Sequence, residues 1–171
     1  MNADRRKAMV RVDQAGEYGA TRIYAGQLAV MGTRGEGADE IAAMASQEAE
    51  HLKKFDALIA SRGVRPTALQ PFWHVAGFAL GAATALIGPK AAMACTAAIE
   101  EEIDRHYSAQ LDELGTSDAE LAGLIGSFRE DERAHRDAAL AAGAEQAPFY
   151  PLLSGAIRLG CRVAIRLSEK I

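Results

Sequence analysis

A Glu-x-x-His pattern occurs twice in this chain of 171 residues, once in "QEAEHL" and once in "EDERAHRDA". Each copy lies in a long run of good helix formers, where residues three apart point to the same side. In both runs the neighbours on that side, at three-to-four residue spacing, are apolar. A buried carboxylate and imidazole are costly without partners, and one metal ion can be the partner of both. The repeat therefore predicts a helical protein with metal-binding side chains in its core.

The two apolar stripes identify two pairs of candidate metal ligands. The first pair is Glu48 with His51, and the second is Glu132 with His135. One Glu-x-x-His on a helix is a weak signal, because such pairs are usually solvated. Two copies on buried stripes are far more specific, and the other histidines of the chain have no Glu three residues before them.

Each pair is preceded by a helix that supplies one more inward glutamate. Glu17 lies on the apolar side of the first predicted helix, within "RVDQAGEYGATRIYAGQ". Three glutamates are adjacent in "AAIEEEIDRHY", and we choose Glu100 because it aligns with the apolar positions. Glu101 and Glu102 have Arg105 within one turn, so we expect both to be exposed ion pairs. Four carboxylates and two imidazoles can hold two metal ions inside a four-helix bundle.

Glycine and proline divide the chain into helices, and no segment alternates with the period of a strand. We expect helices over residues 3–31, 38–62, 72–87 and 89–114, one that follows "TSD" and ends near Gly143, and one from "APFYP" to the C-terminus. Residues 63–88 would connect the two helix pairs. The fold expected is all-α: a single domain, residues 1–171, with a ferritin-like four-helix bundle, an additional apolar crossover helix and a C-terminal amphipathic helix.

Composition narrows the classes of function. The net charge is −4 and no basic block is dense, so we expect no nucleic-acid partner. Cys95 and Cys161 form no C-x-x-C pair, which favours a reducing compartment without a disulfide framework. The opening "MNADRRKAMV" has no apolar segment of the kind found in secretory signals.

Four stretches resemble the demethoxyubiquinone hydroxylases of ubiquinone biosynthesis: "DQAGEYGATRIYAGQ", "QEAEHL", "CTAAIEEEIDRHY" and "EDERAHRDAA". The resemblance extends from about residue 10 to the C-terminus, although Gln14 stands where members often have His. It implies a di-iron monooxygenase that hydroxylates the ring of a polyprenyl methoxy-methyl-benzoquinol, the penultimate step to ubiquinone. Its cofactor would be two Fe ions, and its co-substrates O₂ and an external reductant. No glycine motif for a nucleotide is present, so the electron donor stays open.

The family's metal ligands correspond to the six residues chosen above: Glu17, Glu48, His51, Glu100, Glu132 and His135. We expect Glu48 and Glu132 to bridge both ions. Glu17 and His51 would complete one ion, and Glu100 and His135 the other. The resemblance also implies that His106 and Tyr107 help electrons to enter, although tyrosines placed like Tyr107 and Tyr24 are more often core packing than redox groups.

The roles of two aspartates and of two segments each have two possible interpretations. Asp13 and Asp104 lie one turn from proposed ligands and are either partners of the ligand histidines or caps and surface charges. Residues 75–89 are uncharged but short for a spanning helix, and the C-terminal segment carries a basic stripe, Arg158, Arg162, Arg166 and Lys170. These segments indicate either peripheral attachment to anionic lipid or packing surfaces.

Peripheral attachment would place the protein on the cytoplasmic face of a membrane, the inner membrane in a bacterium, where it meets its quinol and any accessory lipid-binding protein. Three other functions compete with quinol hydroxylation: a ferritin-like iron-binding or oxidase protein, a rubrerythrin-like peroxidase, and a metal-free helical interaction module whose carboxylates pair with Arg and Lys.

Overall fold

The computed structural model describes residues 1–171 and contains helices and connecting turns only. The elements are α1 (Ala3–Met31), α2 (Ala38–Arg62), α3 (Gln70–Ile87), α4 (Pro89–Leu114), α5 (Ala119–Ala141), the 3-10 turn η1 (Ala144–Gln146) and α6 (Tyr150–Lys170). The all-α prediction is confirmed, and the helices expected from Gly and Pro positions form nearly as expected.

The helix ends follow the capping chemistry of the sequence. Asn2 caps α1 by accepting a hydrogen bond from the backbone N–H of Arg5 at 2.8 Å. Asp118, the last residue of "TSD", caps α5 in the same way through the N–H of Leu121 at 3.1 Å. Gly63 ends α2 with φ +58°, a left-handed conformation that glycine adopts without steric cost.

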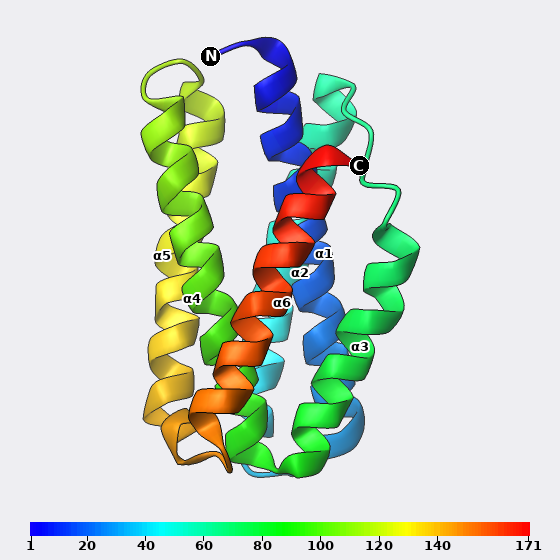
Figure 1. Cartoon of the computed structure of the whole chain (residues 1–171), viewed down its shortest axis with the longest axis vertical. Coiled ribbons are helices and arrows are strands. Elements are labelled where there is room, and N and C mark those ends of the chain that lie inside the picture. Colours follow the sequence, from blue (N-terminus) through cyan, green and yellow to red (C-terminus); the bar gives the residue numbers. More distant parts are fainter.

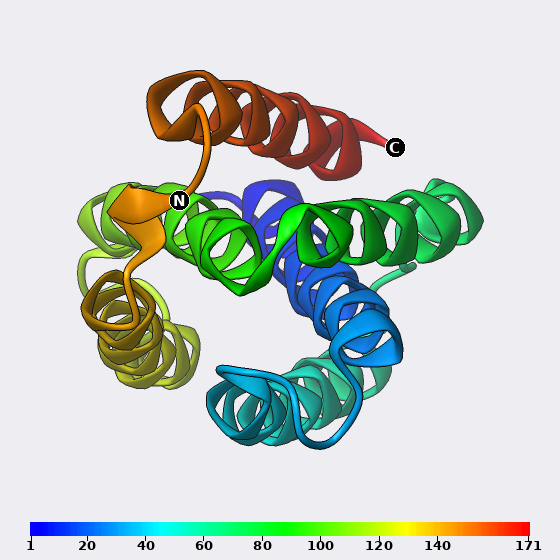
Figure 2. The same ribbon diagram turned by 90° about the horizontal axis from the view of Figure 1, so that it is seen from below.

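Four of the helices form the bundle and two cover one side of it. The hairpin of α1 and α2 packs beside the hairpin of α4 and α5, and α3 is the crossover between them (Figure 1). The crossover packs mainly on α1, whereas α6 lies on α4 and α1. Figure 2 shows α6 on the side of the molecule away from α2 and α5. The expected bundle, crossover helix and C-terminal helix are therefore all present.

Two apolar clusters lie at different heights in the bundle, with the motif residues between them. Along α2, Met44 of one cluster comes before Glu48 and His51, and Phe55 of the other cluster comes after. Along α5, which runs antiparallel to α2, the order is reversed: the cluster that contains Phe55 comes before the Glu and His, and the cluster that contains Met44 comes after them. The polar motif therefore occupies a layer sealed above and below by apolar side chains.

Small residues let α3 approach α1 closely. A Cβ atom on Gly81 would lie 1.9 Å from the carbonyl oxygen of Ile23, and one on Gly26 would lie 2.1 Å from that of Phe78. Any larger side chain at either glycine would push the two backbones apart. One face of the uncharged segment is thus a packing surface for the bundle.

Two of the four basic residues in the stripe on α6 pair with glutamates of α4. Arg158 forms an ion pair with Glu101, and Arg162 forms two hydrogen bonds to Glu102, at 2.9 and 3.0 Å. The expectation that Glu102 is exposed is wrong: it is buried, because α6 covers it and Arg105 also donates to it at 2.7 Å. The stripe therefore anchors α6 to α4.

The outward faces of α3 and α6 are apolar. Most of the large exposed hydrophobic side chains of the molecule lie on or beside these helices: Phe72, Val75, Leu86 and Ile87 on α3, and Phe149, Leu152, Leu159, Val163 and Leu167 at α6. None of the helices is both long enough and apolar enough to cross a lipid bilayer.

Candidate metal centre

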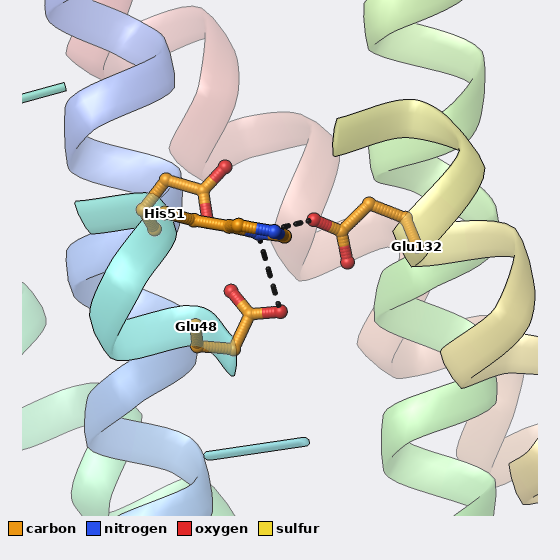
Figure 3. A group of neighbouring side chains, drawn as sticks. Glu48, His51 and Glu132 are labelled. Carbon is orange, nitrogen blue, oxygen red and sulfur yellow. Dashed lines mark ion pairs between the residues drawn. The ribbon is translucent and has the colours of Figure 1, made fainter. Parts of the chain in front are cut away.

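The structure brings all six predicted ligands together in the centre of the bundle. They form two sets whose ligand atoms lie within 4.8 Å of one another: Glu17, Glu48, His51 and Glu132 in one, and Glu48, Glu100, Glu132 and His135 in the other. Glu48 and Glu132 belong to both sets. Figure 3 shows Glu48, on the same helix as His51, and Glu132, on the facing helix, both directed at His51; Nδ1 of His51 lies 3.9 Å from Glu48 and 3.3 Å from Glu132.

The atoms that converge here lack hydrogen-bond partners within the protein. Both carboxylate oxygens of Glu48 and of Glu132, and Nδ1 of His51 and of His135, are buried without one. Each unpaired buried polar atom costs about 1–3 kcal/mol. So many unpaired acceptors, aimed at one another, fit a bound cation. Carboxylate oxygens with imidazole nitrogens suit iron or manganese better than metals that prefer thiolates.

Burial and mutual repulsion perturb the ionisation of these groups. Burial raises the pKa of Glu48 and of Glu100 well above the usual range of a carboxyl, and the neighbouring carboxylates raise both further. Burial disfavours the charged form of His51, but Glu132 and Glu17 outweigh it and raise its pKa to about 10. The pKa of His135 is lowered, chiefly by burial. A cation between the carboxylates would relieve the repulsion that raises the glutamate pKa values.

Each of the two motif histidines contacts a residue from the other half of the bundle. Nε2 of His51 lies 3.1 Å from Oδ2 of Asp131, and Nε2 of His135 lies 3.1 Å from Oε1 of Gln47. Both contacts leave Nδ1 directed at the carboxylates, as a metal ligand requires. Sequence reasoning missed both partners, although each stands directly before the Glu of a motif, where the repeat itself marks the position.

The two aspartates proposed as partners of the ligand histidines have other contacts. Asp104 pairs with Arg133 at 2.8 Å and with Arg136 at 3.5 Å, so the surface-charge alternative is correct for it. Asp13 is buried and accepts from Nε2 of His106 at 3.0 Å, and His106 is not among the six. Neither aspartate orients a ligand histidine.

Two tyrosines link the repeats through the outer carboxylates. Tyr24 of α1 donates to Oε1 of Glu100 on α4 at 2.7 Å. In the reverse direction, Tyr107 of α4 donates to Oε1 of Glu17 on α1. Burial raises the pKa of both phenols, so both stay protonated and can donate at neutral pH. Both tyrosines are buried, as expected of core packing residues, but both also contact candidate metal ligands.

An apolar cavity of about 460 Å³ lies beside this layer, walled by α1, α3, α4 and α6. Most of its lining is apolar or glycine, including Ile23, Leu80 and Ile157. His106 and Tyr107 also line it. Because Tyr107 donates to Glu17, the wall of the cavity is in direct contact with the six-residue cluster.

Comparison with known proteins gives one consistent family. The family of ubiquinone biosynthesis protein COQ7 matches residues 4–168. A relative from Rhodospirillum rubrum named 3-demethoxyubiquinol 3-hydroxylase is 57% identical over 95% of this chain and 76% of its own length. A human relative named NADPH-dependent 3-demethoxyubiquinone 3-hydroxylase, mitochondrial, is 52% identical with the same coverage of both chains. A Saccharomyces cerevisiae relative, 5-demethoxyubiquinone hydroxylase, mitochondrial, is 40% identical over 95% of this chain and 77% of its own. The chain belongs to the family of ubiquinone biosynthesis protein COQ7.

Proposed function

We propose that this protein is a 3-demethoxyubiquinol 3-hydroxylase, an O₂-dependent monooxygenase of ubiquinone biosynthesis. The carrying observation is the pair of buried Glu and His sets that share Glu48 and Glu132 beside an apolar cavity. The relatives named as hydroxylases of demethoxyubiquinol or demethoxyubiquinone support the same activity.

The six converging residues would hold two iron ions. In this assignment both ions would share Glu48 and Glu132, one would also be held by Glu17 and His51, and the other by Glu100 and His135; the two overlapping sets support this division. When bound, a pair of ferrous ions supplies the electrons with which O₂ can be activated toward an aromatic ring, a reaction that side chains alone do not perform.

The chain's own residues would prepare that chemistry in three ways. Asp131 and Gln47 keep the metal-facing nitrogen of each histidine aimed inward. Tyr24 and Tyr107 hold the outer carboxylates by hydrogen bonds across the repeat. The apolar clusters above and below exclude water, which strengthens every electrostatic interaction inside the layer.

The cavity would receive the quinol ring. Its volume of about 460 Å³ lies within the range of about 300–1,000 Å³ common for small-molecule sites. A volume of this size would accommodate a substituted ring and the start of a tail, but not a long polyprenyl chain. Tyr107 places its inner wall next to Glu17, and α3 and α6 form its outer walls. The rest of the tail would leave between these two helices.

The apolar outer faces of α3 and α6 support attachment to a membrane surface. Large exposed residues such as Phe72, Leu86 and Leu159 are costly in water and favourable at a lipid interface. Because the same two helices wall the cavity, a tail leaving the cavity would enter lipid directly. We infer peripheral attachment through these faces, on the cytoplasmic face of a membrane, which in a bacterium would be the inner membrane; the stripe on α6 serves chiefly to fix the helix.

The test is conversion of the quinol with labelled oxygen. Protein loaded with Fe²⁺, supplied with a chemical reductant and ¹⁸O₂, should add one hydroxyl to a methoxy-methyl-polyprenyl-benzoquinol, with ¹⁸O in the new group. Glu17→Ala should abolish conversion and lower the iron bound per chain while the helical circular dichroism is retained. Glu50→Ala is the matched control, since Glu50 is exposed and pairs only with Lys53. Consumption of O₂ without label in the ring would point to an oxidase or iron-storage protein.

A further inference from the structure

Few polar groups line the cavity, and most already have partners. Nε1 of Trp73 donates to Oγ of Ser168 at 2.9 Å, linking α3 to α6. The hydroxyl of Tyr107 is used by Glu17. The thiol of Cys161 is a weak hydrogen-bonding group, and burial raises its pKa to about 12. The remaining polar residues of the lining are Asp13 and His106.

Asp13 has one carboxylate oxygen in use and one unused. Oδ1 lies 3.0 Å from Nε2 of His106 and accepts from Nε2 of Gln110 at 2.8 Å. Oδ2 is buried and has no hydrogen-bond partner. The side chain as a whole is fully buried, so water does not compensate for the missing bond. Because Asp13 lines the cavity, this unpaired oxygen is an acceptor that a ligand bound in the cavity could satisfy.

The substrate class offers the complementary donor. A benzoquinol carries two ring hydroxyls, each a hydrogen-bond donor, whereas the oxidised quinone carries only carbonyl acceptors. Burial raises the pKa of Asp13 although His106 and Gln110 oppose the shift. The ionised carboxylate of Asp13 would form a charge-assisted hydrogen bond with a ring hydroxyl, which is stronger than a bond between two neutral groups.

Resting on the proposed function, we propose that Asp13 is the quinol-binding residue of the cavity: its Oδ2 accepts a hydrogen bond from one ring hydroxyl. His106 and Gln110 hold the opposite oxygen and so fix the orientation of the carboxylate. The same geometry makes the site selective for the reduced substrate. A quinone carbonyl in this position would face a carboxylate oxygen and leave both without a donor.

The experiment compares binding of the two redox forms by calorimetry. The probe is a methoxy-methyl-benzoquinol with a short alkyl tail, and its quinone, titrated without oxygen into the full chain loaded with redox-inert Zn²⁺. The wild type should prefer the quinol. Asp13→Asn should bind the quinol about tenfold more weakly and the quinone no more weakly, because the amide can donate to a carbonyl. Asp104→Asn, the same change at a carboxylate outside the cavity, should leave both affinities unchanged.

A purely structural role for Asp13 would weaken both redox forms by the same factor, and that result, or no change at all, would overturn the inference. If the wild type binds neither form, the cavity is not the quinol site, and the role assigned to Asp13 is wrong as well.

The two monomethyl ethers of the quinol test the wild-type protein directly, in case Asp13→Asn does not fold. One ether should bind about tenfold more weakly than the other, since only one hydroxyl meets Asp13. Equal binding of both ethers would contradict the assignment.

Discussion

Replacing Glu48 by Gln should stabilise the protein in the presence of a chelator. Glu48 is 1% exposed, and neither of its carboxylate oxygens has a hydrogen-bond partner. Burial and then the charges of Glu132, Glu17 and Glu100 all raise its pKa. Gln has nearly the same shape, carries no charge, and can donate its amide hydrogens to the neighbouring carboxylates. Without a metal, the glutamate is therefore a cost that the glutamine removes.

The size of the gain can be bounded from both sides. One buried unpaired polar group costs about 1–3 kcal/mol. The gain cannot exceed about 3.4 kcal/mol, the work of protonating at neutral pH a carboxyl whose ordinary pKa is 4.5, at about 1.36 kcal/mol for each pKa unit. For a chain of this size each kcal/mol moves the Tm by about 2–4 °C. We therefore expect Glu48→Gln to raise the Tm in chelator by about 3–10 °C.

Thermal unfolding followed by circular dichroism, with chelator and with excess divalent metal, checks this reasoning. Metal at a hundredfold excess over its Kd should stabilise the wild type by about 2.7 kcal/mol for each ion, and the variant much less, since a shared ligand is lost. Glu50→Gln on the same helix is exposed and should stay within about 0.5 kcal/mol of the wild type in both conditions. A Glu48→Gln protein that is less stable than the wild type in chelator, or equally stabilised by metal, would refute the argument.

Four further outcomes follow from the same structure. Folding raises the pKa values of Glu48, Glu100 and His51, so these groups stabilise the folded state most below their unfolded pKa values and lose that contribution as pH rises. The Tm of the chelated protein should therefore fall between about pH 5 and pH 9. Bound metal should make the Tm depend less on pH. Asp131→Ala should weaken metal binding about 10–100-fold in a chelator competition, because His51 loses its orienting partner. Gly81→Ala should destabilise folding by about 2–4 kcal/mol in urea unfolding, whereas Gly123→Ala, with free space around its Cβ, should be neutral or stabilising by up to about 1 kcal/mol. Leu159→Glu should reduce flotation with liposomes, and Gly123→Ala should not.

The helices and the six clustered Glu and His residues could be predicted from sequence because each depends on local signals. Helix ends follow from single residues such as Gly63 and Asp118, whose caps act within one turn. The inward faces follow from helical periodicity, which distinguishes Glu100 from its two neighbours. The repeat then predicts that the two helix pairs face each other, because the buried Glu and His residues of each pair need polar or charged partners.

Partners that come from a distant helix could not be predicted in this way. Glu102 looked exposed because its neighbours within α4 are charged, but its burial depends on where α6 packs and on the reach of Arg162. Asp131 has no local reason to orient His51, since the two belong to different helix pairs. Such contacts depend on the distance between helices, and a single sequence does not give that distance.

The repeat makes the ligands symmetric, but their surroundings are not. The position completed by Glu17 and His51 has a carboxylate, Asp131, behind its histidine, whereas the other has the neutral amide of Gln47. A carboxylate partner raises the basicity of a histidine ligand more than an amide does. The same position is the one that Tyr107 connects to the cavity; Tyr24, its counterpart in the repeat, does not line the cavity. If the two sets hold metal ions as proposed, the more electron-rich position would lie nearer the cavity, and a ring bound there would meet two unequal ions, although the repeat alone would make them alike.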